Sequence, residues 1–296
     1  MDYLKLLAKN ISAVSGMDEL ETLVRDLESG SLPLEESFQA FERGMALKAR
    51  LTKLLEEGDK RIRVLTENGE EPLWITCCRP ARLAKEPDLL FVTRRGMVKR
   101  TAAADYDVRG KKFAAVNLKA GDSLLTVLPA FTRDDLLMFT RAGMCIRFGL
   151  DTVPVQGRIS AGVRGMQVDE EDELIWCGQV GENDEMVLFS ERGYGKRILS
   201  CDFEKQNRNG KGVKSFYFNK SGSNGTCVAG AALLAGDGAG AQVRVEQRMS
   251  PPTVLAVQEA PLQGKQDKGL PLVMALMDDV VTAVEGAMES GTTEEG

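Results

Sequence analysis

The chain has 296 residues, a formal net charge of −6, no histidine and six cysteines. The lack of histidine excludes histidine-based catalysis and histidine metal ligands, and the cysteines show no C-x-x-C pair or zinc spacing. No apolar stretch reaches the ~18 residues that a membrane span needs, so we expect a cytoplasmic protein with no membrane partner.

Residues 1–16 are an N-terminal extension that lacks the features of a secretion signal. Residues 17–68 are predicted to form a helical hairpin, because Gly30 can end one helix and Pro33 can begin the next. Two helices of this size bury little surface by themselves. We therefore expect their apolar stripe to bind a partner, although it could instead pack only on the rest of this chain. The candidate interface residues are Leu20, Leu23, Leu27, Phe38, Phe41 and Met45.

Residues 69–86 are interpreted as a linker or a remnant strand, and residues 87–286 carry a repeated pattern. Its first part reads TRRGMVKR at 93–100, TRAGMCIR at 140–147 and SERGYGKR at 190–197. A second part ends at Val116, Val163, Val213 and Leu270, at successive intervals of 47, 50 and 57 residues. Short apolar runs around glycine turns are typical of antiparallel hairpins, and such periods indicate a repeat array. We predict a multidomain α and β chain in which an all-β, propeller-like array of about four blades follows the helical hairpin.

The charge is unevenly distributed. Residues 87–220 hold 21 basic and 18 acidic side chains, whereas residues 221–296 hold 4 and 10. Residues 287–296 are expected to be an acidic disordered tail. Cations that recur at equivalent positions of the blades favour contact with phosphates without sequence readout, and the alternative is a solvated face. The candidate DNA-binding residues are Arg94, Arg95, Lys99, Arg100, Lys111, Lys112, Arg147, Arg158, Arg164, Lys196, Arg197, Arg208, Lys211 and Lys214. The Lys-Arg pairs at 99–100 and 196–197 are expected to face one common rim.

Residues 17–66 resemble the small subunit of exodeoxyribonuclease VII. The similarity is carried by MDELETLVRDLESG at 17–30, LPLEESF at 32–38 and FERGM at 41–45. Such a resemblance implies a non-catalytic helical subunit whose partner is the large nuclease subunit of a complex that degrades single-stranded DNA.

Residues 88–286 resemble the C-terminal β-pinwheel of the gyrase and topoisomerase IV A subunits, on FVTRRGMVKRT at 91–101, QGRISAGVRG at 156–165 and GYGKR at 193–197. This resemblance implies blades that bind and wrap duplex DNA. The fourth copy lacks the glycine-basic hairpin at 231–257, and QNRNGKG at 206–212 only approximates the wrapping box of that family. The tyrosine-bearing catalytic domain of the family has no counterpart in the chain.

Three functions compete, of which we predict the first and keep the second as its alternative. The first is an accessory subunit of exodeoxyribonuclease VII fused to a duplex-DNA-binding pinwheel, with DNA and the large nuclease subunit as partners. The second is a DNA-wrapping module that works with gyrase or topoisomerase IV subunits in trans. The third is a fused product whose parts no longer work together. In all three the chain has no catalytic residues of its own, no metal site and no cofactor, although the first two place it beside a hydrolase or a topoisomerase.

Overall fold

The computed structural model describes residues 37–49, 52–53, 87–108, 113–131, 135–234, 241–276 and 278–288. The chain divides into two compact units, residues 1–82 and 83–296. The boundaries expected at 16, 68 and 286 stay predictions. The expected first helix with Leu20, Leu23 and Leu27 lies outside the described residues, as do Lys111 and Lys112 and residues 289–296 of the expected acidic tail, whose residues 287–288 end the last strand.

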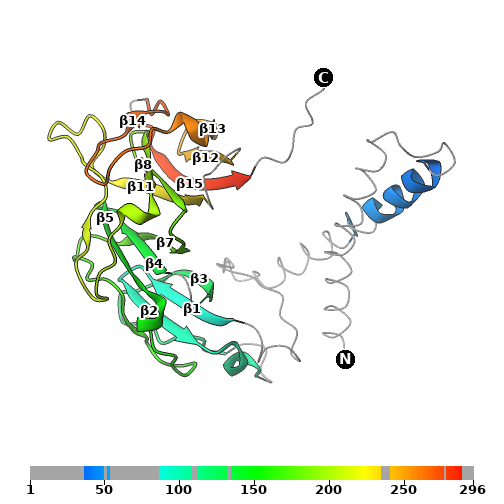
Figure 1. The fold of residues 1–296 in the computed structure, drawn as a ribbon, viewed down its shortest axis with the longest axis horizontal. Helices are drawn as coiled ribbons and strands as arrows, with labels where there is room; N and C mark the ends of the chain where they lie inside the picture. Colours follow the sequence, from blue (N-terminus) through cyan, green and yellow to red (C-terminus); the bar gives the residue numbers. More distant parts are fainter. Residues whose placement is uncertain are drawn as a thin grey trace. The chain divides into compact units, whose positions relative to one another are not determined.

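Residues 37–49 of the first unit form a helix, drawn in blue in Figure 1. Phe38, Phe41 and Met45 recur at the spacing of one helical face. Their exposed fractions are 64%, 58% and 52%. The described part of this unit therefore presents an apolar stripe to solvent.

The second unit is built from β-hairpins. Each is flanked by a third strand that pairs with the first strand of the hairpin, so the core of every sheet is a three-stranded antiparallel unit. The hairpins are β1 (Asp88–Thr93) with β2 (Met97–Thr101), β4 (Asp135–Thr140) with β5 (Met144–Gly149), β8 (Glu185–Ser190) with β9 (Tyr194–Leu199), and β12 (Ala241–Gln247) with β13 (Thr253–Ala256). The third strands are β3 (Leu124–Ala130), β7 (Leu174–Val180), β11 (Val228–Leu234) and β15 (Val281–Met288). Short 3₁₀ turns follow the hairpins: η2 (Ala103–Tyr106), η3 (Leu150–Thr152), η4 (Ser200–Asp202) and η5 (Val257–Glu259).

A two-residue strand from each following repeat completes three of the four sheets. β6 (Val163–Arg164) pairs with β2, β10 (Val213–Lys214) pairs with β5, and β14 (Leu270–Pro271) pairs with β9. The sheet of β12 has three strands in the described residues. The prediction of an all-β array of about four blades is confirmed, and the blades are interlocked because each of the later repeats donates a strand to its predecessor.

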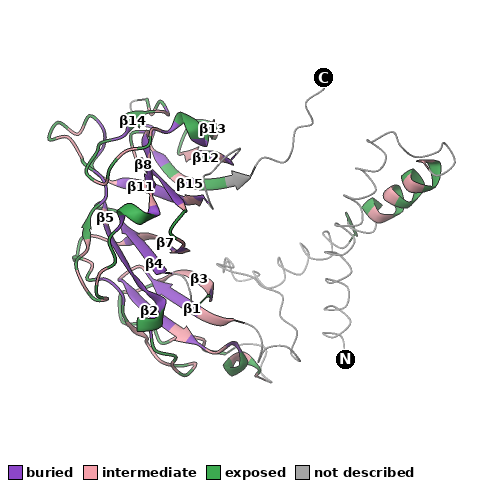
Figure 2. Cartoon of the chain, in the orientation of Figure 1, coloured by how far each residue is buried: buried purple, intermediate pink, exposed green. Residues whose placement is uncertain are grey.

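The core lies between consecutive sheets. One apolar cluster joins the sheets of β1 and β4, a second joins those of β4 and β8, and a third joins those of β8 and β12. Figure 1 shows the four sheets following one another along an arc. In Figure 2, β4 and β5 are almost wholly buried. Such central strands read as continuous apolar runs rather than as an alternation because apolar clusters cover both of their faces.

The glycine of the repeated hairpin is required by a close approach of the next repeat. Gly96 has φ of 82°, which favours a residue without a Cβ. A Cβ atom at Gly96 would lie 2.5 Å from the carbonyl oxygen of Met166. The Gly96 carbonyl accepts hydrogen bonds from the backbone N–H groups of Gly165 and Met166. In the fourth hairpin the turn is Arg248-Met-Ser-Pro-Pro252, which holds no glycine.

Candidate nucleic-acid interface

The lysine of the repeated Lys-Arg pair lies inside the array. Lys196 is 0% exposed, and its Nζ donates hydrogen bonds to the carbonyl oxygens of Gly264, Lys265 and Asp267 at 2.8, 3.0 and 2.8 Å. It also lies 5.0 Å from the centroid of the Phe216 ring. A buried ammonium needs such acceptors, and the loop of the following repeat supplies them.

Lys99 has the same role in the first repeat. It is 1% exposed, and its Nζ donates to the carbonyl oxygens of Ala115, at 2.6 Å, and of Arg158. Burial lowers the pKa of both Lys99 and Lys196 to about 8. The expectation that Lys99 and Lys196 face an outer rim is therefore wrong, because each ammonium fixes a loop within the array.

The arginine of the pair is held by a carboxylate at the start of the same hairpin. Arg100 pairs with Asp88 at 2.6 Å, Arg147 with Asp135 at 2.9 Å, and Arg197 with Glu185 at 2.7 Å. Arg147 is buried, and the other two are partly buried. The expected position of Arg100 and Arg197 on an open rim is wrong, because each guanidinium pairs with a carboxylate of its own hairpin. Arg147, a candidate for DNA contact, is held in the same kind of pair.

The second part of the repeat places its cations differently. Arg164, Lys211 and Lys214 are exposed, and Arg158 and Arg208 are partly exposed. Their loops lie on the preceding hairpins, as shown by the hydrogen bonds from Gln156 N–H to the Arg100 carbonyl and from Gln206 N–H to the Arg147 carbonyl. These loops therefore carry cations to the junctions between blades.

Several of these cations have partners. Arg208 Nη1 donates to the carbonyl oxygen of Arg164 at 2.6 Å, and the Arg158 guanidinium lies 5.2 Å from the centroid of the Phe113 ring. Lys211 lies 3.8 Å from Asp169. Both members of that last pair are strongly exposed, so their attraction is weak and screened by salt.

Arg94 and Arg95 of the first hairpin turn lie beside these loops. Arg94 forms an ion pair with Glu173 at 3.4 Å. Arg95 Nη1 donates to the carbonyl oxygens of Asp169, Glu170 and Asp172 at 3.2, 3.0 and 2.7 Å. Arg95 therefore ties the first hairpin turn to the acidic turn of the second repeat.

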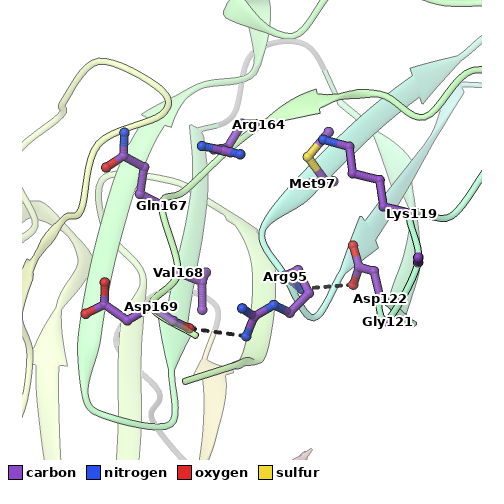
Figure 3. Close-up of a pocket in the computed structure, with 10 residues that line it drawn as sticks. Arg95, Met97, Lys119, Gly121, Asp122, Arg164, Gln167, Val168 and Asp169 are labelled. Atoms are coloured by element: carbon purple, nitrogen blue, oxygen red, sulfur yellow. Dashed lines mark hydrogen bonds between the residues drawn. The ribbon is translucent and has the colours of Figure 1, made fainter. Parts of the chain in front are cut away.

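Arg95 also lines a polar cavity of about 440 Å³ with Lys119 and Arg164 (Figure 3). Asp122, Gln167 and Asp169 complete its polar wall. Sequence reasoning did not include Lys119 among the candidates, because it belongs to neither repeated motif. Its position three residues after the end of the second motif was the available signal.

Two cysteines are buried in the apolar clusters of the β unit. Burial raises the pKa of the Cys145 and Cys177 thiols to about 12, which makes them poor nucleophiles. No group of three or more His, Cys, Asp or Glu side chains in the described ranges could hold a metal ion. No helix among the described residues is long and apolar enough to cross a membrane.

Two family models match the chain. The model of the exonuclease VII small subunit matches residues 15–64. The model of the DNA gyrase C-terminal domain, a β-propeller, matches residues 87–130, 134–180 and 184–223. These three segments begin at the first three hairpins. The fourth hairpin, which lacks the glycine-basic pattern, lies outside the match.

Individual relatives agree with the second match. The DNA gyrase A subunit of Chlamydia muridarum is 30% identical over 213 residues, which cover 70% of this chain and 25% of the relative. The DNA gyrase A subunit of Staphylococcus aureus is 32% identical over 143 residues, which cover 47% and 16%. The chain thus spans a quarter or less of the length of these curated relatives.

Solved structures agree on the fold. The C-terminal domain of DNA topoisomerase IV superposes with a TM-score of 0.63 at 24% identity, covering 69% of this chain and 62% of that one. The DNA gyrase A C-terminal domain superposes with a TM-score of 0.60 at 21% identity, covering 70% and 67%. The chain therefore joins a segment that resembles the exonuclease VII small subunit to a β-pinwheel that resembles the C-terminal domain of the gyrase and topoisomerase IV A subunits.

Proposed function

We propose that the β-pinwheel binds and wraps duplex DNA and works with the catalytic subunits of a type IIA topoisomerase in trans. The interlocked sheets and the matches to the gyrase A subunit support this function. They favour it over an accessory nuclease role, because that role depends on a match of residues 15–64 alone.

The observation that carries the proposal is the repeated exposure of cations at the junctions between blades. Arg164 and Lys214 lie on the strands β6 and β10, which pair with the preceding sheet, and Lys211 lies in the loop before β10. Exposed Lys and Arg side chains can neutralise backbone phosphates of a duplex. Such contacts fix the position of a duplex and carry no base readout.

The acidic side chains near these loops are compatible with this function. Asp169 is 80% exposed in its pairing with Lys211. An exposed pair of this kind contributes ~0–1 kcal/mol, so a phosphate can replace the carboxylate at small cost. The loop lysines are therefore available to DNA.

The test is fluorescence anisotropy of the full chain with a short duplex over a salt series. Binding should be weak, independent of sequence and strongly dependent on salt. The variant Lys211→Gln/Lys214→Gln should lower the slope of log affinity against log salt by about one per lost contact. Lys48→Gln/Lys53→Gln, at two exposed lysines of the first unit, is the charge-matched control and should leave the slope unchanged.

Two results would count against the proposal. A wild-type chain that does not bind at low salt would show that the junction cations are only a solvated face. Equal slopes for the Lys211→Gln/Lys214→Gln variant and the wild type would show that DNA contacts another surface.

A second function is favoured by the exposed stripe of Phe38, Phe41 and Met45. We infer that this stripe docks on the large subunit of exodeoxyribonuclease VII, because residues 15–64 match the small-subunit family. Phe38→Asp/Phe41→Asp should abolish capture of that large subunit, since an unpaired charge buried in an apolar interface costs several kcal/mol. Gln39→Asp adds charge to an exposed neighbour and should leave capture intact. Undiminished capture by the double variant would refute this function.

A further inference from the structure

The polar cavity of Figure 3 belongs to a pocket that recurs along the array. At the first junction, between the sheets of β1 and β4, the pocket is lined by Arg95, Met97 and Arg164, and Met97 pairs with Arg164 across β2 and β6. At the third junction, between the sheets of β8 and β12, a second pocket is lined by Arg192 and Tyr194, and Tyr194 pairs with Pro271 across β9 and β14. The hairpin turn and the donated strand therefore build an equivalent pocket at both places.

The donated strand changes in charge from one junction to the next. Arg164 of β6 corresponds to Lys214 of β10 and to Pro271 of β14, because each pairs with the residue that follows the turn glycine of the preceding hairpin. The cation at this position is therefore lost by the third junction.

The turn before the third strand of each repeat changes as well. The turn begins at Lys119 in the first repeat, at Asp169 in the second and at Asn219 in the third. The carbonyl oxygens of these residues accept hydrogen bonds from the N–H groups of Asp122, Asp172 and Gly222, at 3.0, 3.1 and 2.9 Å respectively. The first junction thus combines Arg95, Lys119 and Arg164. The other described junctions do not repeat this set of three cations.

Each carboxylate of the first pocket has a partner other than Lys119 and Arg164. Asp122 Oδ1 accepts hydrogen bonds from the backbone N–H groups of Arg95 and Ser123, whereas its Oδ2 is buried without a hydrogen-bond partner among the described residues. Asp169 lies beside Lys211. Within the described part of the chain, the side chains of Lys119 and Arg164 form no ion pair. Figure 3 shows both of them extending toward one side of the pocket.

The first repeat also has a shorter segment between the end of the second motif and the turn that precedes the third strand. Lys119 follows Val116 by 3 residues, whereas Asp169 follows Val163 by 6 and Asn219 follows Val213 by 6. The additional residues include Met166 and Phe216, which are buried in clusters shared with the preceding sheet. The first repeat has no preceding sheet in the described residues, and its short turn leaves Lys119 exposed at the end of the array.

We propose that Arg95, Lys119 and Arg164 form a phosphate-binding site at the first junction, and that its ligand is a backbone phosphate of duplex DNA. This inference rests on the proposed function and adds to it a preferred contact at one end of the arc. Arg95 positions the acidic turn of the second repeat and lines the pocket, and Lys119 and Arg164 supply the unpaired charge. A cavity of about 440 Å³ has room for a phosphate group and its hydration.

The test compares Lys119→Gln, Arg164→Gln and the double variant with the wild type by anisotropy with a short duplex. Each single change should lower the slope of log affinity against log salt concentration by about one. For the double variant, the loss of affinity between about 50 and about 200 mM salt should be about tenfold smaller than for the wild type. Lys220→Gln, in the equivalent turn of the third repeat, is the matched control and should keep the wild-type slope.

The outcomes separate this site from the general proposal. If the wild type binds DNA and the double variant keeps its slope, or if Lys220→Gln lowers the slope equally, the site is refuted and the proposed function stands. If the wild type does not bind, both fail. A melting temperature raised by inorganic phosphate in the wild type but not in the double variant, with the DNA slope unchanged, would identify a free phosphate site and overturn the assignment to DNA.

Discussion

At the scale of single residues, adjacent cations in one motif have distinct roles. Lys196 inserts into a cage of three carbonyl oxygens, and Arg197 pairs with Glu185 at the start of the same hairpin. In the second repeat the lysine is replaced by Ile146, which belongs to the first apolar cluster. The third position after the turn glycine therefore contributes to the stability of a junction through either a caged ammonium or an apolar side chain.

Lys196→Met should destabilise the array. Methionine has a similar length but cannot donate hydrogen bonds, so the carbonyl groups of Gly264, Lys265 and Asp267 lose their donor. We expect a loss of about 2–4 kcal/mol in the free energy of unfolding, measured with urea at neutral pH. Lys205→Met removes an exposed lysine and should cost less than about 1 kcal/mol. Equal losses in the two variants would contradict the cage.

The stability of the wild type and of Lys196→Met should also differ in its pH dependence. The pKa of Lys196 is about 8 in the folded chain and 10.5 without the effect of burial. Between these values the unfolded chain binds more protons than the folded chain, so this lysine makes stability rise with pH. Urea unfolding across this window should show a smaller rise, or a steeper fall, for Lys196→Met than for the wild type. Parallel pH profiles would contradict the lowered pKa.

At the scale of elements, the hairpin turn and the loop of the next repeat form one unit. The Gly193 carbonyl accepts hydrogen bonds from the N–H groups of Leu272 and Val273 at 3.0 and 3.1 Å. The same kind of contact occurs at Gly96 and Gly143. The fourth hairpin turn has prolines instead of this glycine, and its sheet has no fourth strand in the described residues. Proline at a sheet edge blocks further pairing.

Gly193→Ala should weaken the third junction. Gly193 has φ of 77°, and an added Cβ atom would collide with the Val273 carbonyl oxygen. Strain in this conformation and displacement of β14 should together cost about 1–3 kcal/mol of unfolding free energy. Gly157→Ala is the control, because a Cβ atom there meets nothing within 4 Å. A wild-type unfolding midpoint for Gly193→Ala would show that the close approach is not required.

At the scale of the whole β unit, each sheet packs against the sheets that precede and follow it in the sequence. Each apolar cluster joins two consecutive sheets, and each donated strand reaches one sheet back. Stability in such arrays is approximately a sum of repeat and nearest-neighbour terms. The repeats at the two ends of the described array are accordingly atypical. The first has a shortened turn, and the last has a hairpin without glycine.

The sequence by itself determined the repeat positions, the hairpins and the four-blade array, because glycine turns and short apolar runs are local signals. It also included Arg164, Lys211 and Lys214 among the candidate DNA-binding cations, without separating them from the cations that are buried. The helix with Phe38, Phe41 and Met45 was likewise visible from spacing alone.

Only the tertiary structure decided which cations are available to a ligand. The carbonyl groups that hold Lys196 lie 68 to 71 residues further along the chain, and no periodicity specifies that contact. The same holds for Lys119, which joins Arg95 and Arg164 only when the second repeat docks on the first. Charge is a property of the residue, whereas its burial depends on backbone supplied by another repeat. The sequence therefore located the cations, and packing between repeats separated those that hold the array together from those that can bind phosphate.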